Sequence, residues 1–294
     1  MADSNNIQWF PGHMARTRRK ITEDLKLVDI VTEIVDARIP LSSTNPVLNE
    51  IIKDKPKVIL LNKYDIADKR QNDLWVNYYS SKNQKAILFD SKNGKGMQKY
   101  YSTITQVLDE KIKKWENKGM IGKSIKIMVV GIPNVGKSSF INRLIGSGKS
   151  GKAEVQDRPG VTRHNRWFNV QKGFEVLDTP GVLWPKIEDP NSARMLAYTG
   201  AIKDEIMDME TLACNFLEYI SINYSDSLNT RYKTDFNKDE PLPGYGMLKE
   251  IGRKRGMLIS GGEINTERAS ITLIDEFRSG KLGRITLEQV KDNG

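Results

Sequence analysis

The chain has 294 residues, of which 38% are hydrophobic and 28% are charged, an ordinary composition for a globular protein with one full domain and a smaller second one. A single cysteine, Cys214, and two histidines exclude an internal disulfide and a standard Cys/His zinc site. Neither a signal peptide nor an apolar run near the ~18 residues of a membrane helix is recognisable, so we expect a cytoplasmic protein with no membrane partner.

Basic residues are concentrated in the first part of the chain. The net charge is +9, and the first 184 residues hold 31 Lys and Arg against 19 Asp and Glu, whereas the remainder holds 15 against 18. This distribution predicts a polyanionic partner that faces mainly the first part. The alternative is a well-solvated basic surface with no such partner.

Short β-branched apolar runs alternate with longer helical stretches in the first 184 residues. The expected strands are Ile30–Val35, Lys57–Leu61, Ala86–Phe89, Ile125–Val130 and Phe174–Leu177. Such alternation predicts an α/β fold with a mostly parallel sheet. Each run ends in a polar or glycine-rich segment, where open α/β sheets bind their ligands.

The strand pattern stops after about Trp184. A lysine-rich bridge at residues 109–126 is expected to be a helix that ends near Gly119, followed by a connector. Further helices are expected at Met209–Ile220, Gly246–Arg255 and Thr266–Ser279, the last with Asn265 as its N-terminal cap and Gly280 at its end. The sequence therefore predicts one domain at residues 1–184 and a helical domain at 185–294.

The segment GIPNVGKS, from Gly131 to Ser138, directly follows a predicted strand and matches the P-loop pattern G-x-x-x-x-G-K-[ST]. In such a loop Lys137 reaches the β and γ phosphates, and the Ser138 hydroxyl ligates Mg²⁺. The other P-loop residues expected to contact the nucleotide are Asn134, Val135, Gly136 and Ser139.

Two segments after the P-loop have the spacing of GTPase switches. Asp178 and Gly181 bracket the sequence DTPG, in which the Asp holds Mg²⁺ through water and the Gly N–H meets the γ phosphate. Thr162, in the sequence DRPGVTRHN, is expected to supply a further magnesium ligand.

A base-reading motif, NKYD, follows the second predicted strand and comprises Asn62, Lys63, Tyr64 and Asp65. The Asp65 carboxylate can accept hydrogen bonds from N1–H and the 2-amino group of guanine, a donor pair that adenine lacks. We expect Asn62 and the Lys63 stem to flank the base. A final base-contacting loop is expected at Asp90 and Ser91, where the sequence departs from the usual Ser-Ala-Lys.

The base-reading motifs precede the P-loop, the reverse of the usual order. This order, with WFPGHMAR, VDARIP and GIPNVGKSS and with the tail segments RKRGMLISGGEIN and FRSGKLGRITLE, resembles the circularly permuted ribosome-assembly GTPases of the ribosome biogenesis GTPase A group. The resemblance implies a permuted P-loop GTPase domain followed by a smaller helical domain. It further implies a GTP hydrolase that binds the immature large ribosomal subunit, acts late in its assembly, is stimulated by it and leaves after hydrolysis. The implied partners are GTP or GDP, rRNA and ribosomal proteins, with no DNA.

Val182 and Leu183 stand where many GTPases carry the glutamine that orients the attacking water. The resemblance assigns that role to His13, an imidazole able to position a water near neutral pH. Alternatively, His13 packs beside Trp9 and Phe10 or contacts RNA, and His164 is a rival for the catalytic role.

The resemblance also raises a potassium site at Asn134, the alternative being an asparagine that only shapes the loop. Two other classes of function stay open: a nucleotide-gated RNA-binding scaffold with incidental hydrolysis, and a signalling GTPase. The basic charge and the lack of a lipidation motif disfavour signalling.

Overall fold

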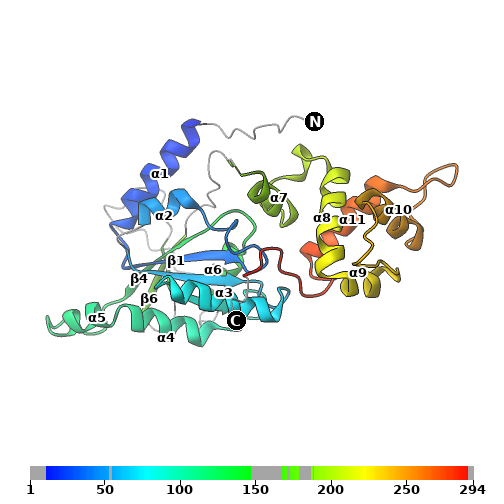
Figure 1. Ribbon diagram of the computed structural model, residues 1–294. Helices are drawn as coiled ribbons and strands as arrows, with labels where there is room; N and C mark the ends of the chain where they lie inside the picture. Colours follow the sequence, from blue (N-terminus) through cyan, green and yellow to red (C-terminus); the bar gives the residue numbers. More distant parts are fainter. Residues whose placement is uncertain are drawn as a thin grey trace. The chain divides into compact units, whose positions relative to one another are not determined.

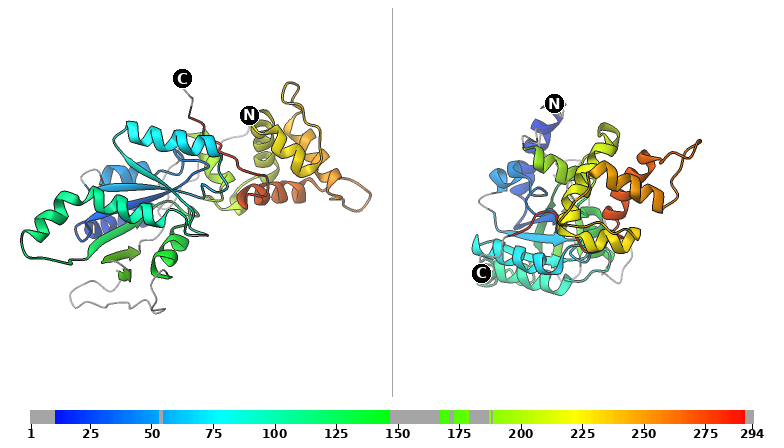
Figure 2. Two further views of the ribbon diagram at one scale, coloured as in Figure 1. Left: turned by 90° about the horizontal axis from the view of Figure 1, so that it is seen from below. Right: turned by 45° about the vertical axis from the view of Figure 1, so that its right-hand side comes forward.

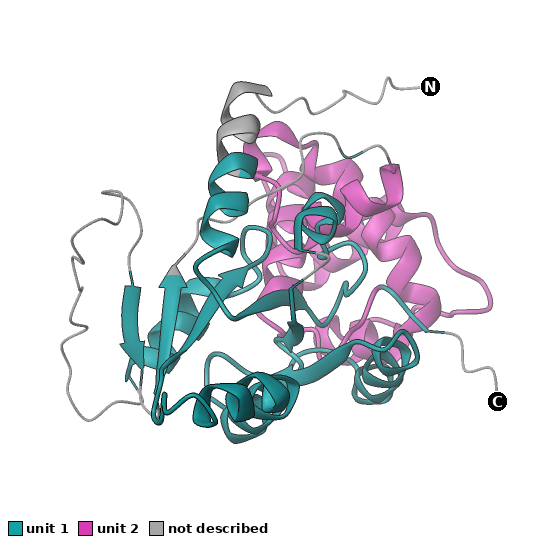
Figure 3. Cartoon of the chain, turned by 90° about the vertical axis from the view of Figure 1, so that its left-hand side faces the viewer, with its two compact units in different colours: residues 1–188, 288–294 teal, residues 189–287 magenta. Residues whose placement is uncertain are grey.

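The computed structural model describes residues 11–52, 55–146, 167–170, 173–178, 187 and 189–290, and for residues 11–17 and 178 it describes the backbone alone. The chain divides into two compact units (Figure 3). Unit 1 comprises residues 1–188 and 288–294, and unit 2 comprises residues 189–287. The chain thus leaves unit 1 once and returns to it at Glu288, whereas the expected helical domain at 185–294 included that last stretch.

Unit 1 is built on a six-stranded sheet with the order β3-β2-β1-β4-β6-β5. Figure 1 labels its strands β1, β4 and β6. The parallel strands are β1 Ile30–Asp36, β2 Lys57–Asn62, β3 Lys85–Phe89, β4 Ile125–Val130 and β6 Phe174–Asp178. All five predicted strands are confirmed. The antiparallel edge strand β5, Trp167–Val170, was not predicted. It has only four residues, too few for a clear periodicity signal.

Helices cover both faces of this sheet. Val31 and Val35 of β1 pack with residues of α1 Pro11–Leu25, α2 Pro46–Ile52 and α3 Lys69–Ser81. Thr32 points to the other face, because side chains alternate along a strand. There its hydroxyl lies 2.8 Å from the Tyr100 hydroxyl of α4 Met97–Val107.

The second face continues onto α6, Lys137–Gly146, through aromatic packing. The ring of Phe140 in α6 meets those of Phe89 and Tyr100 edge-on, with centroids 5.0 and 5.1 Å apart. Strands buried on both faces are mostly apolar, which is why β2 and β4 consist mainly of Ile, Val, Leu and Met, whereas β1 also buries Thr32 and Glu33.

Between α4 and β4 the chain forms α5, Asp109–Glu116, a helix that buries none of its residues. The expected helix in the lysine-rich bridge is thus confirmed. It ends at Glu116, and Gly119 lies in the turn that follows, with φ 74°. Figures 1 and 2 show α5 and this turn at the outer end of unit 1.

Unit 2 is helical in its described residues. Its helices are α7 Pro190–Tyr198, the 3₁₀ turn Asp204–Ile206, α8 Met209–Asn223, α9 Ser225–Tyr232, α10 Gly244–Lys254 and α11 Thr266–Arg278. The expected helices at α8, α10 and α11 are confirmed, whereas α7 and α9 were not predicted. Asn265 caps α11 as expected, its Oδ1 accepting a 2.8 Å bond from the Arg268 N–H.

Close packing of α8 and α10 depends on a glycine. A Cβ on Gly244, the first residue of α10, would lie 2.4 Å from the carbonyl oxygen of Cys214 in α8. No described helix of either unit is long and apolar enough to cross a bilayer.

Candidate functional site

The predicted motifs meet at one edge of the sheet, because β1, β2, β3, β4 and β6 are parallel and their carboxyl ends coincide. β2 ends at Asn62, the first residue of the base-reading motif, and β6 ends at Asp178. The Asp178 Cα pairs with that of Val129, just before the P-loop. Segments far apart in the sequence thereby form one site.

The P-loop joins β4 to α6. Gly131 and Gly136 have φ values of 153° and 98°, which glycine adopts without strain. A Cβ on Gly136 would lie 2.3 Å from Nδ2 of Asn62, so no other residue fits there. Lys137 begins α6, and the exposed Ser138 and Ser139 occupy its first turn. The N–H groups of a helix N-terminus face outward there, ready for phosphate.

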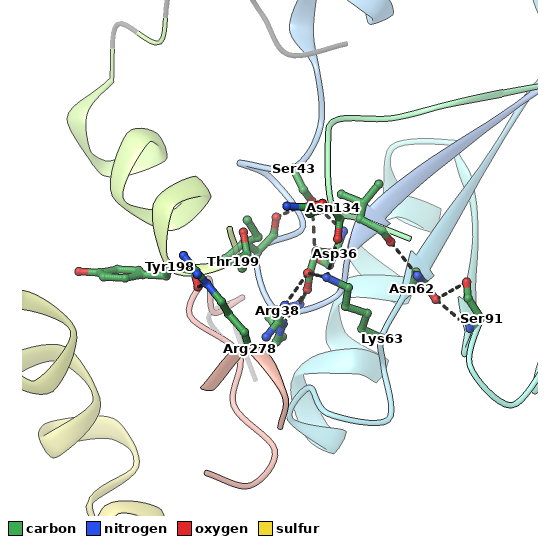
Figure 4. A network of polar contacts seen from close by, with 12 residues as sticks. Asp36, Arg38, Ser43, Asn62, Lys63, Ser91, Asn134, Tyr198, Thr199 and Arg278 are labelled. Carbon is green, nitrogen blue, oxygen red and sulfur yellow. Dashed lines mark hydrogen bonds and ion pairs between the residues drawn. The ribbon is translucent and has the colours of Figure 1, made fainter. Parts of the chain in front are cut away.

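Asn62 holds three loops together with one buried amide (Figure 4). Its Nδ2 donates a 2.7 Å hydrogen bond to the carbonyl of Val135 in the P-loop. Its Oδ1 accepts bonds of 3.0 and 2.9 Å from the N–H and hydroxyl of Ser91. The expected role of Asn62 was to flank the base. The structure places its side chain between the P-loop and the Ser91 loop.

Lys63 spans from the base-reading motif to the P-loop (Figure 4). It has a left-handed backbone with φ 62°, and its Nζ donates to the carbonyl of Asn134 at 2.7 Å and to the carboxylate of Asp36 at 2.8 Å. Asn134 also has a left-handed backbone, with φ 62°. Lys137 donates to the carbonyl of Ile132 at 2.7 Å, which keeps its ammonium group over the loop.

Asp36, the last residue of β1, forms ion pairs with two cations, Arg38 and Lys63. Its carboxylate accepts bonds of 2.9 and 2.8 Å from Nε and Nη2 of Arg38 as well as the bond from Lys63. Burial would raise the pKa of Asp36, but the charges of Arg38 and then Lys63 hold that pKa well below its usual value. Asp36 therefore stays ionised at pH values that would protonate an ordinary aspartate.

Asp90 shapes the loop that was expected to contact the base. Its carboxylate accepts bonds from the N–H groups of Lys92 and Asn93 at 2.9 and 3.0 Å. Asp65 and Tyr64 lie in the turn after β2 and are partly exposed, and the Tyr64 carbonyl accepts a 2.9 Å bond from Asn72 of α3. The Asp65 carboxylate is thus accessible to a base.

Several expected site residues lie outside the described part. Thr162, Gly181 and His164 are not described at all. His13 lies in the first turn of α1, and Asp178 ends β6, but their side chains are not described. Their roles in magnesium binding and catalysis stay predictions.

The described residues suit a nucleoside triphosphate with its magnesium ion. Gly131 and Gly136 let the loop pack closely against Ile34 and Asn62, where a Cβ would collide. The exposed Ser138 hydroxyl is a hard oxygen donor of the kind Mg²⁺ prefers. Among the described side chains no group of three His, Cys, Asp or Glu could hold a metal by itself. That is expected where phosphate oxygens supply most ligands.

Comparison with known proteins decides the family. Residues 126–222 match the family model described as 50S ribosome-binding GTPase. The chain is 43% identical to ribosome biogenesis GTPase A of Bacillus licheniformis over 97% of its own length and 99% of the relative's. The protein of that name from Priestia megaterium is 44% identical, with 96% of both chains covered. The chain belongs to the ribosome biogenesis GTPase A family.

Solved structures agree with this membership. The GDP-bound structure of YlqF from Thermotoga maritima superposes with a TM-score of 0.68 at 25% identity, covering 93% of this chain and all of that one. A second structure of that protein, bound to GNP, has a TM-score of 0.63. This member of the ribosome biogenesis GTPase A family is thus a circularly permuted P-loop GTPase that binds and hydrolyses GTP. It shares the magnesium requirement typical of such enzymes.

Sequence reasoning missed the polar contacts that connect these motifs. Asp36 and Arg38 were noted only as part of a motif shared with relatives, although a carboxylate at the end of a buried strand on the ligand edge is itself a signal. The C-terminal strap, Glu288–Val290, was missed entirely. Glu288 accepts bonds from the N–H groups of Leu41 and Ser42, at 2.6 and 3.0 Å, and from the Ser42 hydroxyl.

The strap also contacts α3. The indole N–H of Trp75 donates to the Glu288 carbonyl at 2.8 Å, and the N–H of Val290 donates to Gln71 at 2.8 Å. Residues 288–290 are therefore fixed beside the loop that follows β1.

Proposed function

We propose that this GTPase binds the immature large ribosomal subunit in its GTP state, promotes a late assembly step and leaves after hydrolysis to GDP and phosphate. The observation that supports nucleotide dependence is the Asn62 side chain, whose hydrogen bonds join the base-reading motif to the P-loop and to the Ser91 loop. The names of the relatives supply the ribosome-assembly context, and the net charge of +9 fits a partner rich in RNA.

Each expected residue has a distinct role in the proposed site. Lys137 and the N–H groups of Val135, Gly136 and Ser139 hold the phosphates, and Asp65 selects guanine. The magnesium ion, which neutralises phosphate charge, would be held by Ser138, Thr162 and, through water, Asp178. Asn134 is the proposed contact for an additional K⁺.

For catalysis we propose that His13 positions the attacking water, because Val182 and Leu183 have no side chain that can do so. A particle that orders the segment around His13 would raise a slow intrinsic rate. The helical unit, residues 189–287, is proposed to bind rRNA or ribosomal proteins together with the basic surface of unit 1.

The deciding experiment is GTP hydrolysis with and without purified large ribosomal subunits, for the wild type and His13→Ala. We expect strong stimulation that the variant loses while its nucleotide and particle binding persist. Stimulation that survives in the variant would move the catalytic role to His164 or to the particle. No stimulation of the wild type would contradict the proposal.

A nucleotide-gated RNA-binding scaffold is the second candidate, favoured by the missing glutamine after Gly181. It predicts particle binding that depends on GTP and a hydrolysis rate that the particle does not change. The same assay therefore separates the two.

A further inference from the structure

The lysine-rich arm, residues 109–126, extends from the end of the sheet opposite the nucleotide site. It comprises α5 and the turn that leads into β4 at Ile125, the amino end of that strand (Figure 1). The arm is attached to the rest of unit 1 through Asp29, which lies just before β1. Nζ of Lys111 forms a 2.6 Å ion pair with the Asp29 carboxylate, and the Lys126 N–H donates to the same carboxylate at 2.9 Å. The motif loops lie at the carboxyl ends of these strands, so the arm is remote from the nucleotide.

The arm carries excess positive charge on exposed positions. It contains six lysines against three acidic residues. Lys111 pairs with Asp29 and Lys113 with Asp109, within the described part. The exposed lysines Lys114, Lys118 and Lys123 form no ion pair with any described residue. Lys114 lies three residues after Lys111 on the same helix face, and Lys118 follows about one turn later.

The aromatic ring of Trp115 contacts two of the lysines of the arm. Nζ of Lys123 lies 4.5 Å from the ring centroid of Trp115 and Nζ of Lys111 lies 5.3 Å from it, both within cation–π range. The turn is thereby joined to α5, which has no buried side chain of its own. Beyond the ring, the side chain of Ile121 is 85% exposed.

Positive charge continues beneath the arm. Lys55 donates to the carbonyl of Val28 at 2.8 Å, and its pKa is lowered first by burial and then by the charge of Lys111. The charge of Asp29 acts in the opposite direction, so Lys55 adds one further cation beside Lys111 and Asp29 at this end of the sheet.

The chemistry of the arm selects among anionic partners. A membrane-binding helix needs a broad apolar face opposite its basic face. The only apolar side chains in α5 are those of Ile112 and Trp115, and the exposed Met120 and Ile121 lie in the turn after the helix, not on a helix face. Separate lysine ammonium groups on a narrow projection instead suit successive backbone phosphates, which they bind as point charges.

We propose that the lysine-rich arm is an RNA-backbone contact, with Lys114, Lys118 and Lys123 as its phosphate-binding residues. The inference rests on the proposed function in that the RNA is taken to be that of the ribosomal particle. The nucleotide site and the arm would then bind different ligands at opposite ends of one sheet.

The test compares the full-length wild type with the triple variant Lys114→Gln, Lys118→Gln, Lys123→Gln. Binding of a fluorescein-labelled RNA duplex is measured by anisotropy across a range of KCl concentrations. The matched control, Lys69→Gln, Lys82→Gln, Lys99→Gln, removes the same charge from exposed positions of α3, its C-terminal cap and α4. Because the substituted side chains are exposed, all variants should keep the thermal midpoint of the wild type.

We expect the arm variant to bind about tenfold more weakly, with the slope of log K against log salt reduced by about 2 to 3. The control should change far less. Equal losses in both variants, no loss in the arm variant, or no RNA binding by the wild type would each overturn the inference. So would a loss of binding to phosphatidylserine-rich vesicles with RNA binding unchanged, which would indicate a lipid surface.

Particle-stimulated GTP hydrolysis separates this inference from the proposed function. If the arm acts as inferred, the arm variant needs about tenfold more particle for half-maximal stimulation and reaches the same maximal rate. If the particle stimulates the wild type and the arm variant needs no more particle for half-maximal stimulation, the inference about the arm is wrong and the proposed function stands. If the arm variant loses duplex binding but the particle does not stimulate the wild type, the inference about the arm stands and the proposed function is wrong.

Discussion

Asp36 is buried and Glu288 is partly buried beside the loop that follows β1, and of these two carboxylates only Asp36 has cations as partners. Asp36 is bound by Arg38 and Lys63 and its pKa lies well below its usual value. Glu288 is bound by Leu41 and Ser42, which are neutral donors, and burial raises its pKa despite these bonds, with a further rise from the charge of Asp36. Hydrogen bonds alone do not compensate fully for removing a carboxylate from water.

The two carboxylates have different structural roles. Asp36 fixes two cations at the nucleotide edge, one of which, Lys63, reaches the P-loop. Glu288 attaches residues 288–290 to the rest of unit 1. Breaking the first contact should cost more stability than breaking the second, and the two carboxylates should respond to pH with opposite signs.

The largest effect is expected for Asp36→Ala. It leaves the fully buried Arg38 guanidinium without its counter-charge, which we expect to destabilise the protein by about 3–5 kcal/mol in urea unfolding. Asp73→Ala, at an exposed position of α3, is the control. Replacing the pair together, as Asp36→Leu with Arg38→Met, should recover most of the loss. If Asp36→Ala lowered the free energy of unfolding by less than about 1 kcal/mol, the proposed distinction between the two carboxylates would be wrong.

Glu288→Ala should have a smaller effect, about 1–3 kcal/mol, because it leaves the N–H groups of Leu41 and Ser42 unsatisfied but uncovers no charge. Urea unfolding measures it against the same control. Hydrogen exchange at Trp75 should also accelerate, since its indole N–H donates to the strap. A loss as large as that of Asp36→Ala would show that the strap carries more than hydrogen bonds.

Lys63→Gln tests whether the Asp36 network serves the nucleotide. The substitution removes the charged contacts to Asp36 and to the Asn134 carbonyl, so we expect GTP-analogue affinity to fall about tenfold. Unfolding free energy should change less than in Asp36→Ala, because the Lys63 side chain is partly exposed. Lys69→Gln is the control. Equal nucleotide affinities of Lys63→Gln and the wild type would show that the Asp36 network does not contribute to nucleotide binding.

The smallest effect is a difference in pH dependence. A depressed pKa contributes stability above the unfolded value of 3.8 that is lost on further acidification, so the advantage of wild type over Asp36→Asn should shrink below about pH 4. A raised pKa acts oppositely. Relative to Glu288→Gln, the wild type should gain stability as pH falls from the raised folded pKa towards the unfolded value of 4.5. Denaturant titrations at several pH values would show whether the two trends have opposite signs, and parallel trends would contradict the comparison.

Much of the molecule follows from sequence alone. The P-loop and NKYD patterns, placed after buried β-branched strands, predicted which loops meet at the sheet edge, because parallel strands bring their carboxyl ends together whatever their order in the chain. Helices α8 and α11 were predictable from local periodicity and the Asn265 cap, which depend on neighbours within one turn.

The tertiary structure decided the contacts that no local pattern contains. Asn62 and Val135 are 73 residues apart, and Ser42 and Glu288 are 246 apart. A buried amide or carboxylate bonds whichever donor the packing brings near, and that choice leaves no trace in spacing or composition. The return of the chain to unit 1 was unpredictable for the same reason. Residues 288–290 have no distinctive local pattern, and their contacts with Trp75 and Gln71 exist only in the folded structure.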